Sequence, residues 1–337
     1  MTEHRGSGPR ATLGIDIGGT KVFGVALDPD GRILAEARLA TPNGERASLL
    51  DPERRGDQVA DAVADLVRQL CSGLEPPVAL GIGAPGMVDR HGVLCFAPNL
   101  PGASGVDVQG LVSGRLGGMA IVVENDANCA ALAELTFGAL QGAGEAAMIT
   151  LGTGIGAGLV VGGQVHLGSN GFAGEVGHMI VDPAGPPCPC GRRGCWERFA
   201  SGAGLGRLAR EAAQAGRLPR VVAAVGGDPE SVHGEDITTA ARHGDPGALG
   251  VLEELGWWVA LGLANVVAVV DPERIVLGGG LAEAGELLLG PTRRAFAELV
   301  EGPGARPPVA LAAATLGERA GAVGAALAAR WAVEGPR

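Results

Sequence analysis

The stretch Asp16-Ile17-Gly18-Gly19-Thr20-Lys21 decides the fold prediction. It separates two apolar runs, residues 11–17 and 22–27, as a tight turn separates the strands of a hairpin. A glycine-rich turn offers unblocked backbone N–H groups and can adopt positive φ, which lets it approach phosphate oxygens closely. Lys21 is the only lysine beside 25 arginines, and its compact charge differs from theirs. These residues fit either a phosphate-binding turn or an ordinary hairpin whose lysine survived a bias toward arginine.

A second glycine-rich hairpin is predicted over residues 147–161. Its turn, Gly152-Thr153-Gly154-Ile155-Gly156, follows the first turn by 136 residues, counted from Asp16 to Gly152. Similar motifs at a long interval indicate similar structural units, so we expect two lobes that each open with a phosphate-facing hairpin. Neither turn has the P-loop spacing G-x-x-x-x-G-K-[ST], which disfavours the P-loop class of nucleotide-binding proteins.

The chain of 337 residues is long enough for two α/β lobes, because domains usually have about 100 to 200 residues. Further strands are predicted over residues 32–39, 78–82, 120–123 and 274–277, and helices over residues 57–70, 127–137, 235–243, 246–270 and 317–331. The last helix is rich in small residues and is expected to pack back on the first lobe. We predict an N-terminal lobe of residues 1–124, completed by residues 317–337, and a larger C-terminal lobe of residues 125–316.

The charge balance argues against a nucleic-acid partner. The formal net charge is −11, whereas affinity for nucleic acid rests on clustered Lys and Arg. The first ten residues are polar and lack the apolar core of a signal peptide, and the apolar run 257–270 is too short to span a bilayer. We therefore expect a cytoplasmic protein with no nucleic-acid or membrane partner.

A third glycine-rich stretch partly matches the motif of a dinucleotide-binding dehydrogenase, but the residues after it disfavour that interpretation. Gly81-Ile82-Gly83-Ala84-Pro85-Gly86 matches the pattern G-x-G-x-x-G after a predicted strand. The dinucleotide fold requires a helix to begin in that turn, whereas residues 87–92 are typical of a strand end followed by a turn.

A candidate catalytic carboxylate stands in Glu124-Asn125-Asp126-Ala127-Asn128, between the strand over 120–123 and the helix over 127–137. In one interpretation Asp126 or Asn125 merely caps the helix, as such residues commonly do. In the other, a carboxylate at the C-terminal end of a strand accepts the proton of a substrate hydroxyl. The residues alone favour both interpretations equally, and a capped carboxylate can serve both purposes.

One imidazole and three thiols within 18 residues predict a metal site, and its ligands are His178, Cys188, Cys190 and Cys195. Three Cys and one His form a closed tetrahedral set for zinc, which makes the ion structural rather than hydrolytic. Gly191 and Gly194 allow the short loop to curl round the ion. The alternative is three buried free cysteines beside a chance histidine. Small buried residues are predicted at the remaining cysteines, Cys71, Cys95 and Cys129.

Taken together and in order, these motifs resemble the ROK (repressor, ORF, kinase) family across almost the whole chain. The resemblance also rests on Gly174-Glu175-Val176-Gly177-His178 and on the cysteine loop through Glu197. Within the family the chain looks most like the bacterial, actinobacterial-type, ATP-dependent glucokinases. The resemblance implies an actin-like ATPase (ribonuclease H-like) α/β fold of two lobes with an interlobe cleft that closes on sugar and nucleotide.

The resemblance also assigns roles to residues of this chain. Asp126 matches the general base that takes the proton of the C6 hydroxyl of glucose. The residues that match sugar contacts are Asn99, Asn125, Asp126, Glu175, His178 and Glu197. The residues that match contacts with ATP and its Mg²⁺ are Asp16, Gly18, Gly19, Thr20, Lys21, Gly152, Thr153, Gly154, Gly278 and Gly279. A structural Zn²⁺ is implied at the cysteine loop, with His178 serving both metal and sugar.

Several alternatives stay open at this point. Kinases for N-acetylglucosamine, N-acetylmannosamine and fructose share most of these residues. The family's repressors carry a DNA-binding segment before the first strand, where this sequence has about ten residues, and a sugar sensor without activity is expected to lack Asp126 or a phosphate turn. Glucose and ATP are the expected partners, in a homodimer or homotetramer. The loop over residues 42–55 departs from the family pattern.

Overall fold

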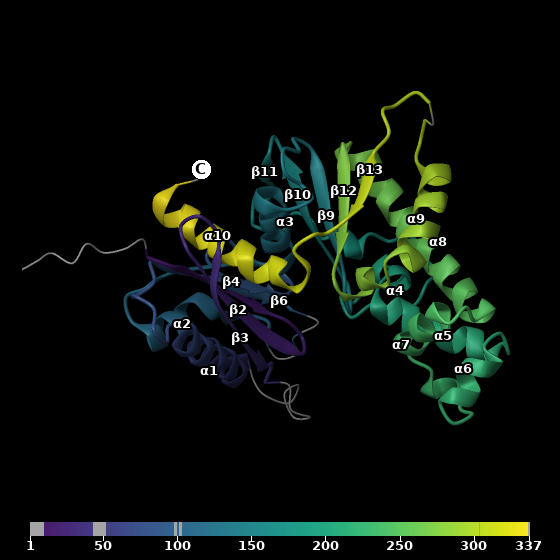
Figure 1. Cartoon of the computed structure of the whole chain (residues 1–337), viewed down its shortest axis with the longest axis horizontal. Helices are drawn as coiled ribbons and strands as arrows, with labels where there is room; N and C mark the ends of the chain where they lie inside the picture. The colour runs from purple at the N-terminus through teal and green to yellow at the C-terminus, as the bar shows by residue number, and fades with distance from the viewer. Residues whose placement is uncertain (1–9, 43–51, 98–99, 101–102, 303, 336–337) are drawn as a thin grey trace, which may run out of the picture. The chain divides into compact units, whose positions relative to one another are not determined.

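The computed structural model describes residues 10–42, 52–97, 100, 103–302 and 304–335 (Figure 1). The chain forms two compact units. Unit 1 contains Met1–Gln141, Gln164–Ala173 and Glu318–Arg337, and unit 2 contains Gly142–Gly163 and Gly174–Gly317. Most of the loop predicted to depart from the family pattern lies outside the described residues.

The first unit extends further than the predicted residue 124. Helix α3 (Asp126–Phe137) belongs to it because α3 packs along α10 (Ala320–Glu334). A side chain on Gly324 of α10 would collide with the backbone of Cys129 in α3. Only a glycine lets these two helices approach so closely, and this contact keeps α3 in unit 1.

Unit 1 is built on a five-stranded sheet with the order β3-β2-β1-β4-β8. These strands are β1 (Thr12–Ile17), β2 (Lys21–Leu27), β3 (Ile33–Ala40), β4 (Ala79–Ala84) and β8 (Ala120–Asn125). The unit also contains β5 (Met87–Val88), β6 (Val93–Phe96), β7 (Val106–Asp107), β11 (Gln164–Val165), α1 (Pro52–Leu70) and α2 (Val108–Leu116). Strand β1 pairs antiparallel with β2, as the predicted hairpin requires, and parallel with β4.

Helices cover both faces of this sheet (Figure 1). On one face, Gly24 lies against Leu66 and Leu70 of α1. On the other, Gly14 of β1 and Gly81 of β4 lie side by side in register and form a flat surface for α10. A Cβ on either glycine would collide with the backbone of α10, at Ala322 and Ala325 respectively. The last helix therefore packs on the first unit, as predicted, and its small residues lie directly on the strand backbone.

Unit 2 repeats this strand topology. Four strands of its sheet run in the order β10-β9-β12-β13, where β9 (Ala146–Leu151) pairs antiparallel with β10 (Ile155–Val161) and parallel with β12 (Arg274–Gly278). Strand β12 pairs parallel with β13 (Ala310–Ala313). In unit 1 the equivalent order is β2-β1-β4-β8, with the same alternation of antiparallel and parallel pairs. The two glycine-rich hairpins thus open two similar sheets.

Helices supply most of the core of unit 2. They are α4 (Glu197–Ala200), α5 (Gly202–Gln214), α6 (Pro219–Ala224), α7 (Gly234–Arg242), α8 (Pro246–Val270) and α9 (Glu286–Leu299). Short 3₁₀ turns are η2 (Val176–His178), η3 (Pro229–Ser231) and η4 (Gly280–Ala284), and η5 (Gly317–Arg319) spans the boundary between the units.

Helix α8 has 25 residues, and its most apolar window of 18 residues has a mean hydropathy of 1.4. By length and composition alone it could cross a membrane, although the apolar run over 257–270 by itself is shorter. Its side chains Leu255, Val259 and Leu263 are fully buried in the core of unit 2, as in a core helix of a folded domain.

The close approach of α10 to the sheet predicts a large effect of Gly81→Ala. The added Cβ meets a backbone carbonyl that cannot rotate away, so we expect the free energy of unfolding to fall by about 3 kcal/mol. Urea unfolding followed by circular dichroism measures this loss. Gly114→Ala in α2 is the control, because its Cβ meets nothing within 4 Å and alanine favours a helix. Equal stability of the two variants would contradict the packing described here.

Candidate active site

The turn between β1 and β2 is tied to its surroundings by backbone hydrogen bonds. The N–H of Gly18 donates to the carbonyl of Lys21 at 2.8 Å, and the Thr41 hydroxyl donates to the carbonyl of Gly18 at 2.6 Å. Gly18 and Gly19 are half-buried, while Thr20 and Lys21 are exposed. The Nζ of Lys21 lies 2.5 Å from the carboxylate of Glu318.

The glycines of both turns do not use the positive φ that glycine can adopt. Gly18, Gly19, Gly152 and Gly154 all have negative or extended φ. A Cβ on Gly152 would meet nothing within 4 Å, whereas a Cβ on Gly18 would lie 3.0 Å from the carbonyl oxygen of Lys21. Gly152 therefore leaves the backbone of its turn uncovered, and Gly18 allows a close approach within the hairpin.

Two carboxyl groups of unit 1 stand near each other. Asp16 lies near the C-terminal end of β1, and Asp126 follows the C-terminal end of β8. Between these strands, Gly83 of β4 pairs with Asp16, and a Cβ at Gly83 would lie 3.6 Å from both Asp16 Oδ1 and Asp126 Cα. The C-terminal edge of parallel strands is where α/β sheets bind ligands.

Burial changes the ionisation of both groups. Burial raises the pKa of Asp126 to about 6, against hydrogen bonds from the backbone N–H groups of Ala127 and Asp126 that lower it. Burial and then the charge of Asp126 raise the pKa of Asp16 to about 7, while Lys21 lowers it. A pKa near neutrality suits a group that exchanges protons with a substrate.

The structure shows which residue caps the helix after β8. Asn125 is the N-cap of α3: its Oδ1 accepts from the N–H groups of Ala127 at 2.9 Å and Asn128 at 3.0 Å. Its Nδ2 donates to the carbonyl of Gly86 at 2.9 Å and to Asp126 Oδ1 at 3.2 Å. The amide of Asn125 thus uses two donors and two acceptor sites within unit 1, so a direct bond to a sugar requires it to exchange one of them. Asn125 caps the helix and orients Asp126.

In unit 2 the two predicted nucleotide-binding stretches lie next to each other. Gly278 pairs with Thr150 at the end of the sheet. Gly279 has a φ of 84°, and a Cβ there would lie within 2.8 Å of three backbone atoms of Leu151. The N–H of Gly202, at the start of α5, donates to the carbonyl of Gly152 at 2.8 Å. Strand β9 therefore delivers its turn directly beside the glycines that follow β12.

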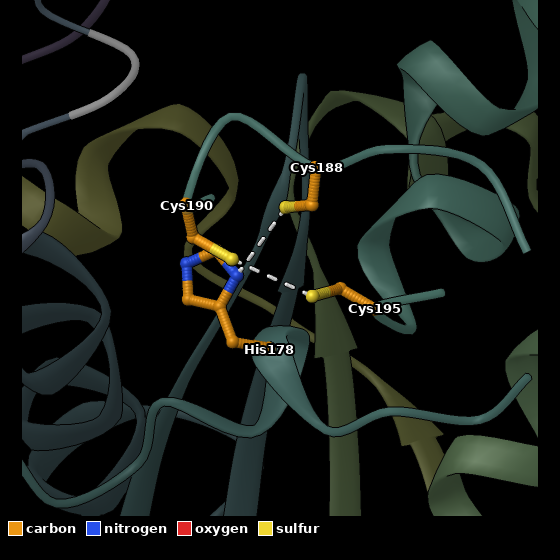
Figure 2. A group of neighbouring side chains, drawn as sticks. All are labelled: His178, Cys188, Cys190 and Cys195. Atoms are coloured by element: carbon orange, nitrogen blue, oxygen red, sulfur yellow. Dashed lines mark hydrogen bonds between the residues drawn. The ribbon is translucent and has the colours of Figure 1, made fainter. Parts of the chain in front are cut away.

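The predicted metal ligands converge. Figure 2 shows the imidazole of His178 and the three thiols pointing toward one another. Their donor atoms all lie within 4.8 Å of one another. His178 Nδ1 lies 3.8 Å from Cys188 Sγ, and Cys190 Sγ lies 3.6 Å from Cys195 Sγ. Gly191 and Gly194 have φ values of 89° and 68°, which confirms that glycine is needed to curl this loop.

Two of the predicted sugar contacts flank this cluster. Glu197 Oε1 lies 3.7 Å from His178 Nδ1, and Glu175 Oε2 lies 3.9 Å from His178 Nε2. The thiol of Cys188 donates to Glu197 Oε1 at 3.0 Å. The Nδ1 atom of His178 therefore faces the thiols, and Nε2 faces Glu175. One imidazole has the geometry to serve a metal on one side and a ligand on the other.

The structure differs from the sequence predictions at a few positions. Asn99 lies outside the described residues. The prediction that Cys95 is a core residue is wrong, because its side chain is exposed on strand β6. Sequence reasoning missed Gly83, Gly86 and Gly321, which contact Asp16, Asp126 or Asn125. Gly83 and Gly86 belong to the stretch over residues 81–86, where the sequence pattern indicates only a possible dinucleotide-binding motif. Residues 85–92 form no helix, which confirms that this stretch lacks the helix of a dinucleotide fold.

Comparisons with known proteins cover nearly the whole chain. The family model described as "ROK family" matches residues 12–331. A glucokinase of Streptomyces coelicolor is 39% identical over 322 residues, which cover 95% of this chain and 97% of that protein. A glucokinase of Thermotoga maritima is 35% identical over 318 residues, 93% of this chain and 95% of that protein.

The fold comparison agrees with these matches. A solved structure described as a ROK family glucokinase from Streptomyces griseus in complex with glucose and AMPPNP aligns with a TM-score of 0.84 and 39% identity. The alignment covers 95% of this chain and 99% of that chain. The predicted actin-like α/β fold is thereby confirmed.

The raised pKa of Asp126 predicts a dependence of stability on pH. The pKa in the folded chain, about 6, exceeds the ordinary value of 3.8, so the folded state binds the proton more tightly and loses stability as pH rises through this interval. Asp126→Asn lacks this carboxyl, and its stability relative to the original protein should increase by about 1 kcal/mol between pH 5 and pH 8. Urea unfolding at both pH values measures the difference. The burial of Asp126 would be contradicted if the stability of Asp126→Asn relative to the original protein fell between pH 5 and pH 8. It would also be contradicted if Asp30→Asn, which changes an exposed carboxyl, gave the same increase.

Proposed function

Since this chain belongs to the ROK family, we propose that it is an ATP-dependent glucokinase, which transfers the γ-phosphoryl group of ATP to the 6-hydroxyl of glucose. The observation that carries the proposal is the oriented carboxyl of Asp126, in a chain that aligns over 95% of its length with a glucokinase bound to glucose and AMPPNP. Its raised pKa, its fixed Oδ1 and its place after a parallel strand are the properties of a general base.

In the proposed reaction Asp126 accepts the proton of the 6-hydroxyl as that oxygen attacks the γ-phosphorus of ATP. The bond from the γ-phosphorus to the bridging oxygen breaks, and the products are glucose 6-phosphate and ADP. A positioned base contributes roughly 10²- to 10⁴-fold to such a rate. Mg²⁺, when bound, neutralises charge on the transferring phosphoryl group, and Asp16 is the carboxylate of this chain that we assign to it.

The remaining site residues divide between sugar and nucleotide. We assign Glu175, His178 and Glu197 to the sugar hydroxyls, because these three side chains already lie together in unit 2; Asn99 and Asn125 join them on the resemblance alone. Buried groups that pair with hydroxyls discriminate strongly, since a missing hydroxyl leaves its partner unsatisfied. We assign the nucleotide phosphates to Gly18, Gly19, Thr20, Lys21, Gly152, Thr153 and Gly154, and the adenosine to Gly278 and Gly279.

The cysteine cluster fits a structural zinc ion. A tetrahedral ion with Zn–S bonds of about 2.3 Å holds its sulfurs about 3.8 Å apart, close to the 3.6 Å between Cys190 and Cys195. Three thiols and one imidazole fill the coordination shell, so His178, Cys188, Cys190 and Cys195 would hold the ion without an open position. The ion would fix the imidazole of His178, and through it the side that faces Glu175.

We place the protein in the cytoplasm, where ATP is available and thiols stay reduced. The assembly implied by the resemblance, a homodimer or homotetramer, stays a prediction.

A coupled assay of ADP release tests the proposed reaction. We expect turnover with glucose to exceed that with mannose, fructose, N-acetylglucosamine and N-acetylmannosamine. Asp126→Asn should fold, bind glucose and lose kcat by about 10²-fold or more, while Asp30→Asn retains it. For the original protein kcat/KM should fall below about pH 6, as Asp126 takes up a proton. A variant at position 126 that keeps more than about a tenth of kcat would refute the role of base.

Metal analysis tests the zinc site. Protein purified without chelator should contain about one zinc per chain, and Cys190→Ser should lose it together with thermal stability, because zinc binding contributes to folding. Cys95→Ser is the matched control, since Cys95 is exposed and lies outside the cluster. The proposal would be refuted if the original protein contained no zinc, or if Cys190→Ser lost the zinc but kept the melting temperature of the original protein.

A further inference from the structure

Lys21 is held by a residue from the far end of the chain. Its Nζ lies 2.5 Å from Oε2 of Glu318, and the two residues are 297 positions apart. Both side chains are nearly half exposed, at 46% and 42%. An exposed ion pair of this kind contributes little to stability, so stability does not explain why the only lysine of the chain has this partner.

Glu318 is itself fixed by its neighbours. Its other oxygen, Oε1, accepts a hydrogen bond from Arg38 Nη2 at 3.2 Å. The next residue, Arg319, donates from Nε to Glu36 Oε1 on β3 at 2.6 Å. Each oxygen of the Glu318 carboxylate thus meets one cation, and the backbone that carries it is attached to β3.

The same segment also fits against Asp16. Gly321, in the first turn of α10, lies so close to Asp16 that a Cβ there would be 2.6 Å from Cγ of Asp16. Glu318 and Gly321 therefore approach the phosphate turn from one side. Residues 318–321 contact both charged groups of the turn, the ammonium of Lys21 and the carboxyl of Asp16.

We propose that Glu318 is a positioning residue that holds the ammonium of Lys21 at the phosphate turn, ready for the terminal phosphate of the nucleotide. The inference rests on the proposed function in one respect, that this turn binds nucleotide phosphates. An ammonium has three N–H donors, so one can be held by Glu318 while the others meet phosphate oxygens. A free lysine side chain would lose rotational freedom on binding, and a side chain that is already held loses less.

The chemistry of lysine supports positioning rather than blockage. An arginine at position 21 would present a planar fork that pairs with both oxygens of one carboxylate, whereas lysine is a compact charge with separate donors. Arg38 already occupies the second oxygen of Glu318. The carboxylate is therefore shared between two cations and does not enclose the ammonium of Lys21.

A double-mutant cycle on nucleotide binding tests the inference. Calorimetry with the full chain and MgAMPPNP gives Kd for the original protein, Glu318→Ala, Lys21→Ala and the double variant. We expect Glu318→Ala to weaken binding about fivefold, and to change it less than about twofold when Lys21 is already alanine, because the two side chains act as one unit. Glu318→Gln, which keeps a neutral acceptor, should fall between the original protein and Glu318→Ala.

Glu36→Ala is the matched control. This substitution removes the ion pair between Glu36 and Arg319, the residue next to Glu318, and Glu36 itself does not contact Lys21. MgAMPPNP should therefore bind within about twofold of its original Kd. In steady state, Glu318→Ala should raise KM for ATP and leave KM for glucose nearly unchanged. A purely structural role would affect Glu36→Ala and Glu318→Ala alike.

Three results would overturn the inference. The first is that Glu318→Ala weakens MgAMPPNP binding by the same factor whether position 21 is lysine or alanine. The second is that Glu318→Ala binds MgAMPPNP more tightly than the original protein. The third is that the original protein does not bind MgAMPPNP. The proposed function fails separately, if the original protein binds MgAMPPNP but phosphorylates no hexose. In that case the binding cycle still decides the role of Glu318.

Discussion

The close packing of α10 on the glycines of β1 and β4 is the constraint on which unit 1 depends. Gly14 and Gly81 lie side by side and leave no side chain between the helix and the sheet. Gly324 on the helix allows an equally close contact with α3. The helix thereby joins β1, β4 and α3, the three elements around Asp16 and Asp126. Any side chain at these positions would move the helix away and, with it, the segment that reaches Lys21.

This arrangement places two carboxyl groups where burial makes ionisation costly. Burial raises the pKa of both Asp16 and Asp126, and the charge of Asp126 raises the pKa of Asp16 further. Lys21 opposes this effect at Asp16. The polar network of Asn125 keeps Asp126 in place, because the cap of α3 and the carbonyl of Gly86 fix the amide beside it. A site of this kind gives up some stability for a group that titrates near neutral pH.

In unit 2 the cysteine loop links the proposed zinc ligands to the core and to the predicted sugar contacts. Trp196, between Cys195 and Glu197, is fully buried, and its indole N–H donates to the carbonyl of Trp258 at 2.7 Å. Gly262 of α8 leaves room for the ring, since a Cβ there would collide with it. Helix α8 therefore anchors one end of the loop, and the cluster of His178 with the three cysteines lies at the other. His178 and Glu197 are positioned by both.

The sequence by itself determined the local parts of this protein. The two hairpins, the capped helix that begins at Asp126 and the cluster of His178 with three cysteines at residues 178–195 each lie within a short stretch. Turn chemistry, periodicity and the spacing of these side chains therefore encode them directly. Only the tertiary structure decided that α3 belongs with unit 1 and that Glu318 holds Lys21 from 297 positions away. It also decided that the side-chain amide of Asn125 forms its hydrogen bonds within the protein. Such pairs depend on how sheets and helices pack, and packing leaves no periodic pattern in the sequence that would connect residues so far apart.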